Sequence, residues 1–83
     1  MHTTAEIALL LAAADSDNIL AKMDTSEGIT IIKQSRGEIS FDGANYASAL
    51  YHLVSTGLMR QGRGALFHLT ERGQAIAQGI SAE

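Results

Sequence analysis

Cysteine and proline are both absent from this chain of 83 residues. Without cysteine the chain can form no disulfide, no thiolate nucleophile and no cysteine-ligated zinc site, and this fits a cytoplasmic protein. Only 18% of the residues are charged whereas 46% are hydrophobic, a composition that argues against a disordered chain. Since a chain of this length has room for one hydrophobic core, we expect residues 1–83 to form a single domain.

Long apolar runs are missing as well. The apolar run at residues 7–14 is far shorter than the roughly 20 residues that a membrane-spanning helix needs. No basic residue precedes it except His2, which is unlike a secretory signal. We therefore expect a core helix at this position, with neither a membrane span nor a targeting segment.

Positive charge is scarce. Six Lys and Arg residues stand against nine Asp and Glu residues, which gives a net charge of −3. Residues 1–42 carry a net charge of −4 and residues 43–83 a net charge of +1. DNA-binding modules draw most of their affinity from contacts between basic side chains and phosphates. Any such contact is therefore expected in the C-terminal half, while an acidic surface suits basic protein partners.

Two helices are indicated by capping and periodicity. Thr3 and Glu6 have the spacing of a capping box, and apolar residues follow at helical intervals, which predicts a helix at about 4–14. A second helix is predicted at about 43–56, ending before Gly57. Its inward face is formed by Tyr46, Leu50, Leu53 and Val54.

The last third of the chain predicts a hairpin and a helix. Two glycines lie in the short polar stretch 60–64 between apolar runs, and this predicts a β-hairpin at about 58–69. Thr70 can cap the helix that follows, and Glu71 lies in its first turn, where the helix dipole favours a carboxylate. We expect this last helix at about 71–79.

The middle of the chain has two interpretations. Residues 19–23 fit either a short helical turn or an extended connector. Ile29, Ile32 and Arg36 share one side of a helix at about 26–36, which we favour. The alternative is a hairpin with β-branched residues 29–32 as one strand, residues 38–41 as the other, and a turn at 35–37.

Residues 40–79 contain a familiar combination of motifs. It consists of Leu50-x-x-Leu53-x-x-x-Gly57-Leu58-Met59, a basic hairpin with glycines, and Phe67-x-Leu69-Thr70-x-x-Gly73. This combination resembles the winged helix-turn-helix transcriptional regulators. The resemblance implies an α+β, mainly α fold with a three-helix core, a C-terminal β-hairpin wing and a final helix. It also implies a small regulator that binds double-stranded DNA with helix 43–56 and the wing. We expect a dimer, because helices 4–14 and 71–79 can present apolar surface to a second copy, and two modules on one duplex bind more tightly than one.

The candidate DNA-binding residues follow from that resemblance and from the outward face of helix 43–56. They are Asn45, Ser48, Ala49 and His52 on the helix, and Arg60, Gln61 and Arg63 on the wing. The helix carries no Lys or Arg, and Asp42 stands at its leading end. The alternative function is therefore a protein–protein interaction module that does not bind DNA.

No catalytic chemistry is indicated. His52 and His68 are too few to complete a zinc site in a chain that lacks cysteine. The sequence Gly62-Arg63-Gly64 lacks the flanking pattern of a nucleotide-binding loop. We expect no enzyme activity, no cofactor and no metal.

Overall fold

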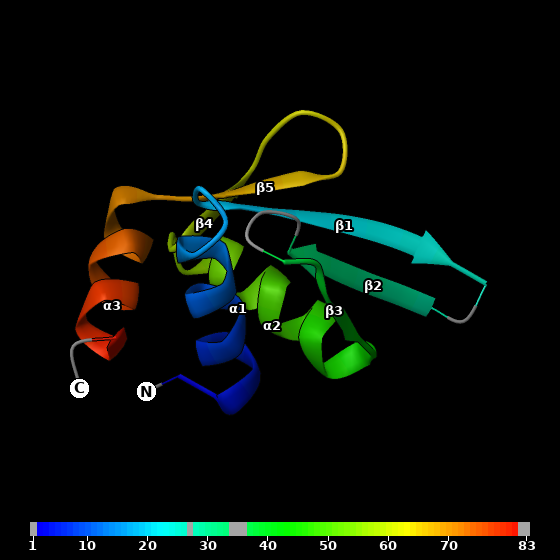
Figure 1. Ribbon diagram of the computed structural model, residues 1–83, viewed down its shortest axis with the longest axis horizontal. Helices are drawn as coiled ribbons and strands as arrows, with labels where there is room; N and C mark the ends of the chain where they lie inside the picture. The colour runs from blue at the N-terminus through cyan, green and yellow to red at the C-terminus, as the bar shows by residue number, and fades with distance from the viewer. Residues whose placement is uncertain (1, 27, 34–36, 82–83) are drawn as a thin grey trace.

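The computed structural model of the chain describes residues 2–26, 28–33 and 37–81. Its elements, in chain order, are α1 (Thr4–Ala14), β1 (Ile19–Thr25), β2 (Gly28–Lys33), β3 (Ile39–Asp42), α2 (Ala44–Ser55), β4 (Met59–Gln61), β5 (Leu66–Leu69) and α3 (Glu71–Ser81). The strands form one antiparallel sheet in the order β3-β2-β1-β5-β4. The three helices lie together below the sheet in the view of Figure 1.

The core lies between the helices and one face of the sheet. Helix α1 contacts β1 and β5, α2 contacts β2 and β4, and α3 contacts β5. The largest fully buried side chains come from both layers and are Leu9, Leu10, Leu20, Ile31, Leu50, Leu53, Met59 and Phe67. The domain therefore has two layers, one of helices and one sheet. None of the described helices packs on the other face of the sheet.

The predicted first helix is confirmed, together with its caps. The Thr3 hydroxyl accepts a hydrogen bond from the backbone N–H of Glu6, and the Glu6 carboxylate accepts one from the N–H of Thr3, both at 3.1 Å. The turn after the helix contains two left-handed residues, Asp17 at φ 54° and Asn18 at φ 65°. Asp and Asn tolerate this conformation better than most residues, so the helix ends where the sequence predicts.

The favoured helix at 26–36 is wrong. Residues 28–33 form β2, which pairs with β3 in register from Thr30–Asp42 to Lys33–Ile39. Residues 19–25 are extended as β1. The hairpin alternative is thus correct in its strands, and its turn at 35–37 lies outside the described residues except for Gly37. The three-residue spacing of Ile29 and Ile32 fits one side of a helix. In the structure these two side chains lie on opposite faces of a sheet that is apolar on both sides, so the same spacing occurs in a strand.

The C-terminal elements are confirmed, but the predicted fold class is wrong. Helix α2, the hairpin of β4 and β5, and α3 lie where they were expected. The hairpin does not stand beside a helical core as a wing, because β5 also pairs with β1 and continues the five-stranded sheet. No helix precedes α2 among residues 19–26, 28–33 and 37–43, so the helix-turn-helix pair is missing there. The fold is α+β, but it is not mainly α.

The motif Leu69-Thr70-x-x-Gly73 has a local packing explanation. The Thr70 hydroxyl caps α3 by accepting from the N–H of Gly73 at 3.1 Å, and it donates to the carbonyl of Gly57 at 2.7 Å. The N–H of Thr70 donates to the carbonyl of Leu58 at 3.1 Å. These bonds hold the start of α3 against the segment that follows α2. The motif therefore stabilises this local connection, and the connection does not require a winged helix-turn-helix fold.

Candidate functional site

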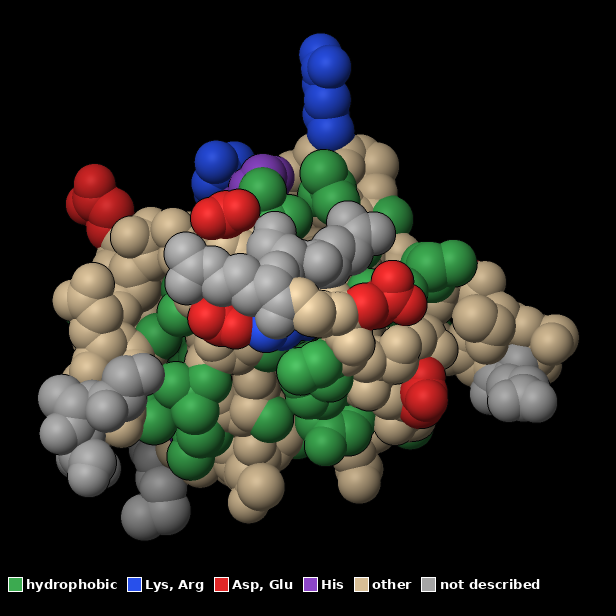
Figure 2. Space-filling view, viewed as in Figure 1, with side chains coloured by type: hydrophobic (Ala, Val, Ile, Leu, Met, Phe, Trp, Pro, Cys, Tyr) green, Lys and Arg blue, Asp and Glu red, His purple; other side chains and the backbone are tan. Residues whose placement is uncertain are grey.

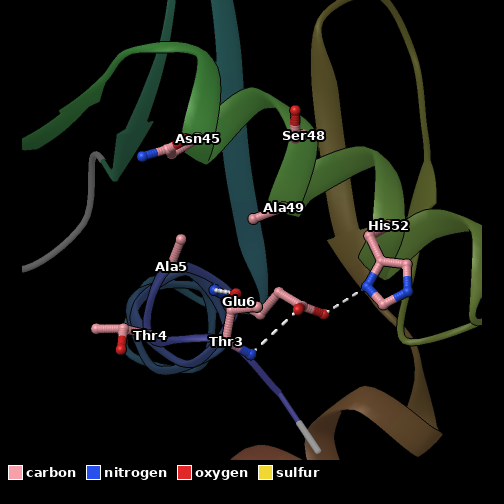
Figure 3. Close-up of a pocket in the computed structure, with 8 residues that line it drawn as sticks. All are labelled: Thr3, Thr4, Ala5, Glu6, Asn45, Ser48, Ala49 and His52. Atoms are coloured by element: carbon pink, nitrogen blue, oxygen red, sulfur yellow. Dashed lines mark hydrogen bonds and ion pairs between the residues drawn. The ribbon is translucent and has the colours of Figure 1, made fainter.

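An open groove of about 580 Å³ lies between the amino-terminal end of α1 and one face of α2. Its lining residues are Thr3, Thr4, Ala5 and Glu6 from α1 and the preceding cap, and Asn45, Ser48, Ala49 and His52 from α2 (Figure 3). All four residues predicted to read DNA from the helix therefore line one groove. This side of α2 faces α1 across the groove, an arrangement that the sequence did not predict.

Ala49 is the clearest correction to the predicted site. It is only 6% exposed and belongs to the core cluster, because α1 packs against α2 at this position. Its methyl group cannot touch a base edge. Asn45 and Ser48 are exposed, and the Ser48 hydroxyl points away from Glu6 in Figure 3.

Glu6 and His52 join the two walls of the groove. The Nδ1 atom of His52 lies 2.7 Å from Oε2 of Glu6, and the other carboxylate oxygen, Oε1, accepts the N–H of Thr3. Glu6 is 3% exposed, whereas the His52 side chain is more than half exposed. The Nδ1 atom of His2 lies 3.8 Å from Oε2 of the same carboxylate. The Glu6–His52 pair connects α1 to α2. Sequence spacing could not reveal this contact because the two residues are 46 positions apart.

The Glu6 carboxyl is held in its charged form. Burial alone would raise its pKa, but the hydrogen bonds from His52 and Thr3 together lower the pKa below its usual value of 4.5. No buried side-chain nitrogen or oxygen among the described residues lacks a hydrogen-bond partner. The packing of α1 on α2 therefore accounts for the buried Glu6 carboxylate through its bonds to Thr3 and His52.

We expect the Glu6 carboxylate to make the free energy of unfolding depend on pH in the acidic range. Because its pKa is lowered on folding, its contribution is complete above about pH 4.5 and is lost as the pH falls through the folded-state pKa. Glu6→Gln should remove this component, so the stability difference between wild type and variant should shrink on acidification. Urea unfolding between pH 7 and pH 3 measures it. The exposed Glu38→Gln variant is the control, and an unchanged difference across that pH range would contradict the expectation.

The other predicted DNA-binding residues lie on the hairpin. Arg60 and Gln61 are exposed on edge strand β4, and Arg63 is exposed in the loop before β5. Arg60 is directly opposite His68 on β5. Gly62 allows this arrangement, since a Cβ atom there would lie 2.4 Å from the His68 ring. In Figure 2 the blue and purple side chains gather mainly along the upper edge of the molecule, at the level of β5 in Figure 1.

The α1 border of the groove and the β4–β5 loop lie at different ends of the molecule. Figure 1 shows the amino-terminal end of α1, which borders the groove, at the opposite end of the molecule from the β4–β5 loop. The two lysines add little free positive charge elsewhere. Lys33 is 5% exposed and pairs with Asp15, and Lys22 lies 4.0 Å from Asp24 and over the Tyr51 ring. The exposed arginines therefore carry most of the positive charge that the described residues present to solvent.

The second face of the sheet is a feature that sequence reasoning missed. Here we call it the outer sheet face, and its apolar centre consists of Ile19, Ala21, Met23, Ile32 and Leu66. The register places these five side chains on the same side, opposite to Leu20, Ile31 and Phe67 of the core. Met23 is 50% exposed and the other four are partly exposed. The signal in the sequence was apolar residues at both odd and even positions of the strands.

Comparison with protein-family models, with curated protein sequences and with solved structures finds no match. Within the described ranges, no three His, Cys, Asp or Glu side chains are grouped in a way that could hold a metal ion. None of the described helices is long and apolar enough to cross a bilayer.

Proposed function

We propose that this chain is a protein-interaction module whose contact surface is the outer sheet face. The observation that carries the proposal is the apolar centre of that face. An antiparallel sheet that is covered on one side usually presents polar side chains to water on the other side. Here the three central strands present Ile, Ala, Met and Leu instead.

The charge of the chain supports a protein partner over a nucleic acid. The net charge is −3, and α2 presents no Lys or Arg to a ligand. A contiguous apolar surface with charged residues only at its borders is typical of a surface that another protein covers. In the same proposal, the module acts in the cytoplasm, as the lack of cysteine suggests.

A photo-cross-linking experiment tests this function. A photoreactive phenylalanine analogue is placed at position 23 on the outer sheet face and, as a control, at the exposed position Ala75 on α3. We expect a discrete protein adduct in a cell extract from position 23 and none from position 75. With the purified, identified partner, Met23→Glu should weaken binding at least tenfold, whereas Ala75→Glu should not. Equal adducts from both positions, or equal affinities of both variants, would sink the proposal.

A second candidate function is nucleic-acid binding for transcriptional control, and the placement of three arginines favours it. Arg60, Arg63 and Arg72 are all exposed and lie on β4, the hairpin loop and the first turn of α3. They concentrate positive charge near one edge of an acidic molecule. In this candidate the hairpin contacts phosphates, and reading of bases by Ala49 is excluded because it is buried.

Salt titration of binding to a random-sequence DNA duplex tests the second candidate. If the hairpin arginines each contact a phosphate, Arg60→Ala with Arg63→Ala should reduce the slope of log affinity against log salt by about two. The control is Lys33→Met, which removes a buried cation. Absence of binding at low ionic strength, or a slope unchanged in the double variant, would rule this candidate out.

A further inference from the structure

The outer sheet face has opposite charges at its two ends along the direction of β1. Met23 lies in a cross-strand row that continues through Thr30 to Asp42 on β3, and we call this row the acidic end. Four residues earlier in β1, Ile19 lies in a row that ends with Arg60 on β4, and we call this row the basic end. Asp42 and Arg60 are both exposed. The apolar centre lies between these two charges.

Each of the two charges has a polar neighbour in its own row. The Asp42 carboxylate accepts a hydrogen bond at 2.8 Å from the hydroxyl of Thr30, its direct neighbour on β2. Arg60 lies directly beside His68 on β5, whose imidazole carries positive charge when it is protonated. Within the described residues, the paired positions of the five strands place no other charged side chain on this face. The face therefore has one negative end and one positive end.

The size of the apolar centre fits a single helix. It spans the three neighbouring strands β2, β1 and β5, which is about 10 Å at a spacing of about 4.8 Å. Along β1 it extends from Ile19 to Met23, which is about 13 Å at about 3.3 Å per residue. About nine residues of an α-helix, which is about 10 Å wide, cover this length. A second folded domain would need a far larger face, of roughly 800 Å² per partner.

The middle row of the face leaves room for such a helix along β1. Ala21 lies directly between Ile32 on β2 and Leu66 on β5. Its side chain is smaller than those of both neighbours, so the space above β1 is bounded by a larger apolar side chain on each side. A helix that places apolar residues at i, i+3, i+4 and i+7 over β1 contacts Ala21 below and the two larger residues at its flanks.

We propose that the partner of the outer sheet face presents one amphipathic α-helix, which lies along β1 with its amino-terminal end at Asp42 and its carboxy-terminal end at Arg60. This proposal rests on the proposed interaction function and names the kind of partner. A helix has partial positive charge at its amino terminus and partial negative charge at its carboxy terminus, so each end meets the opposite charge. The helix therefore runs antiparallel to β1. Basic side chains in its first turn and acidic side chains in its last turn strengthen the attraction.

A synthetic peptide of about 12 residues, held helical by a lactam bridge, tests this proposal. It carries leucine at i, i+3, i+4 and i+7, lysine in its first turn, glutamate in its last turn and a nitroxide at its amino end. We expect it to bind the wild-type domain at least tenfold more tightly than Met23→Glu in an NMR titration. In the complex, the nitroxide should broaden the amide signals of Asp42 and Thr30 far more than that of Arg60.

Exchanging the two charges of the face should turn the peptide around. The double variant Asp42→Arg with Arg60→Glu keeps the apolar centre, so the same peptide should bind with its amino end at position 60, and the broadening should move there. The matched control is Glu71→Arg with Arg72→Glu, which exchanges two exposed charges on α3. In this control the broadening should stay at Asp42. Thermal unfolding of each variant first shows that it folds.

The outcomes separate this inference from the function on which it rests. The oriented helix is overturned by absence of binding to the wild type, by equal binding to Met23→Glu, by equal broadening at both ends, or by a direction that persists in the exchanged variant. In each case, a discrete protein adduct from position 23 that is missing from position 75 keeps the interaction function. Equal adducts from both positions remove the function and the helix together.

Discussion

Replacing Gly73 by alanine should destabilise the domain by about 3 kcal/mol, the upper part of the range for an overpacked core. A Cβ atom at this position would lie 2.0 Å from the carbonyl oxygen of Leu58 and 3.0 Å from Cδ1 of Leu69. The carbonyl cannot turn aside without loss, since it accepts the N–H of Thr70 at 3.1 Å. Denaturant unfolding of the wild type and Gly73→Ala measures the difference.

Gly79 provides a matched control within the same helix. It also lies in α3, but a Cβ atom there would meet nothing within 4 Å. Gly79→Ala should therefore stabilise the domain by up to about 1 kcal/mol through helix propensity alone. If the two glycine variants had equal stability, the close approach of α3 to the carbonyl of Leu58 would not exist in solution.

Replacing Asp15 by asparagine should cost about 2 kcal/mol. Asp15 is the C-cap of α1 and pairs with Lys33, whose side chain on β2 is 6% exposed. Removing the carboxylate charge leaves a buried ammonium group without this ion pair, which is costly in a protein interior. The expected cost is below that of a fully buried pair because the Asp15 side chain is about half exposed. Chemical denaturation at pH 7 measures it.

The reciprocal variant Lys33→Met should behave differently. Methionine fills a similar volume and removes the buried charge instead of stranding it, so stability should change by less than about 1 kcal/mol. The asymmetry between the two variants is the test. If Lys33→Met were as destabilising as Asp15→Asn, the pair would contribute mainly through its hydrogen-bond geometry, and the explanation from charge burial would be wrong.

The parts of the fold that the sequence could predict are those with local signals. The capping box at Thr3, the helical spacing of Leu50 and Leu53, and the Thr70 cap each lie within a few residues of the element that they define. Strands β1 and β2 carry no such signal. Their apolar residues fall at both odd and even positions, because the outer sheet face is apolar as well as the core face. Such a pattern cannot distinguish a strand from a helix.

The candidate site was predictable only residue by residue. The exposure of Asn45, Ser48, Arg60 and Arg63 was correctly expected from polar character. The burial of Ala49 depends on the packing of α1, which is more than 30 residues away in the chain, and no local pattern encodes it. The outer sheet face was missed for the same reason, since its five apolar residues come from three strands that only the tertiary fold brings together.

The central position of β1 has a consequence for how the chain folds. Strand β1 pairs on one side with β2, a few residues later, and on the other with β5, more than 40 residues later. The meander of β1, β2 and β3 can form early, but its free edge is completed only when the hairpin of β4 and β5 docks on it. We therefore expect a single cooperative transition with a nucleus that includes the β1–β5 pairing. A fragment that ends before α2 should not fold on its own, because it lacks the partner strand as well as two of the three helices.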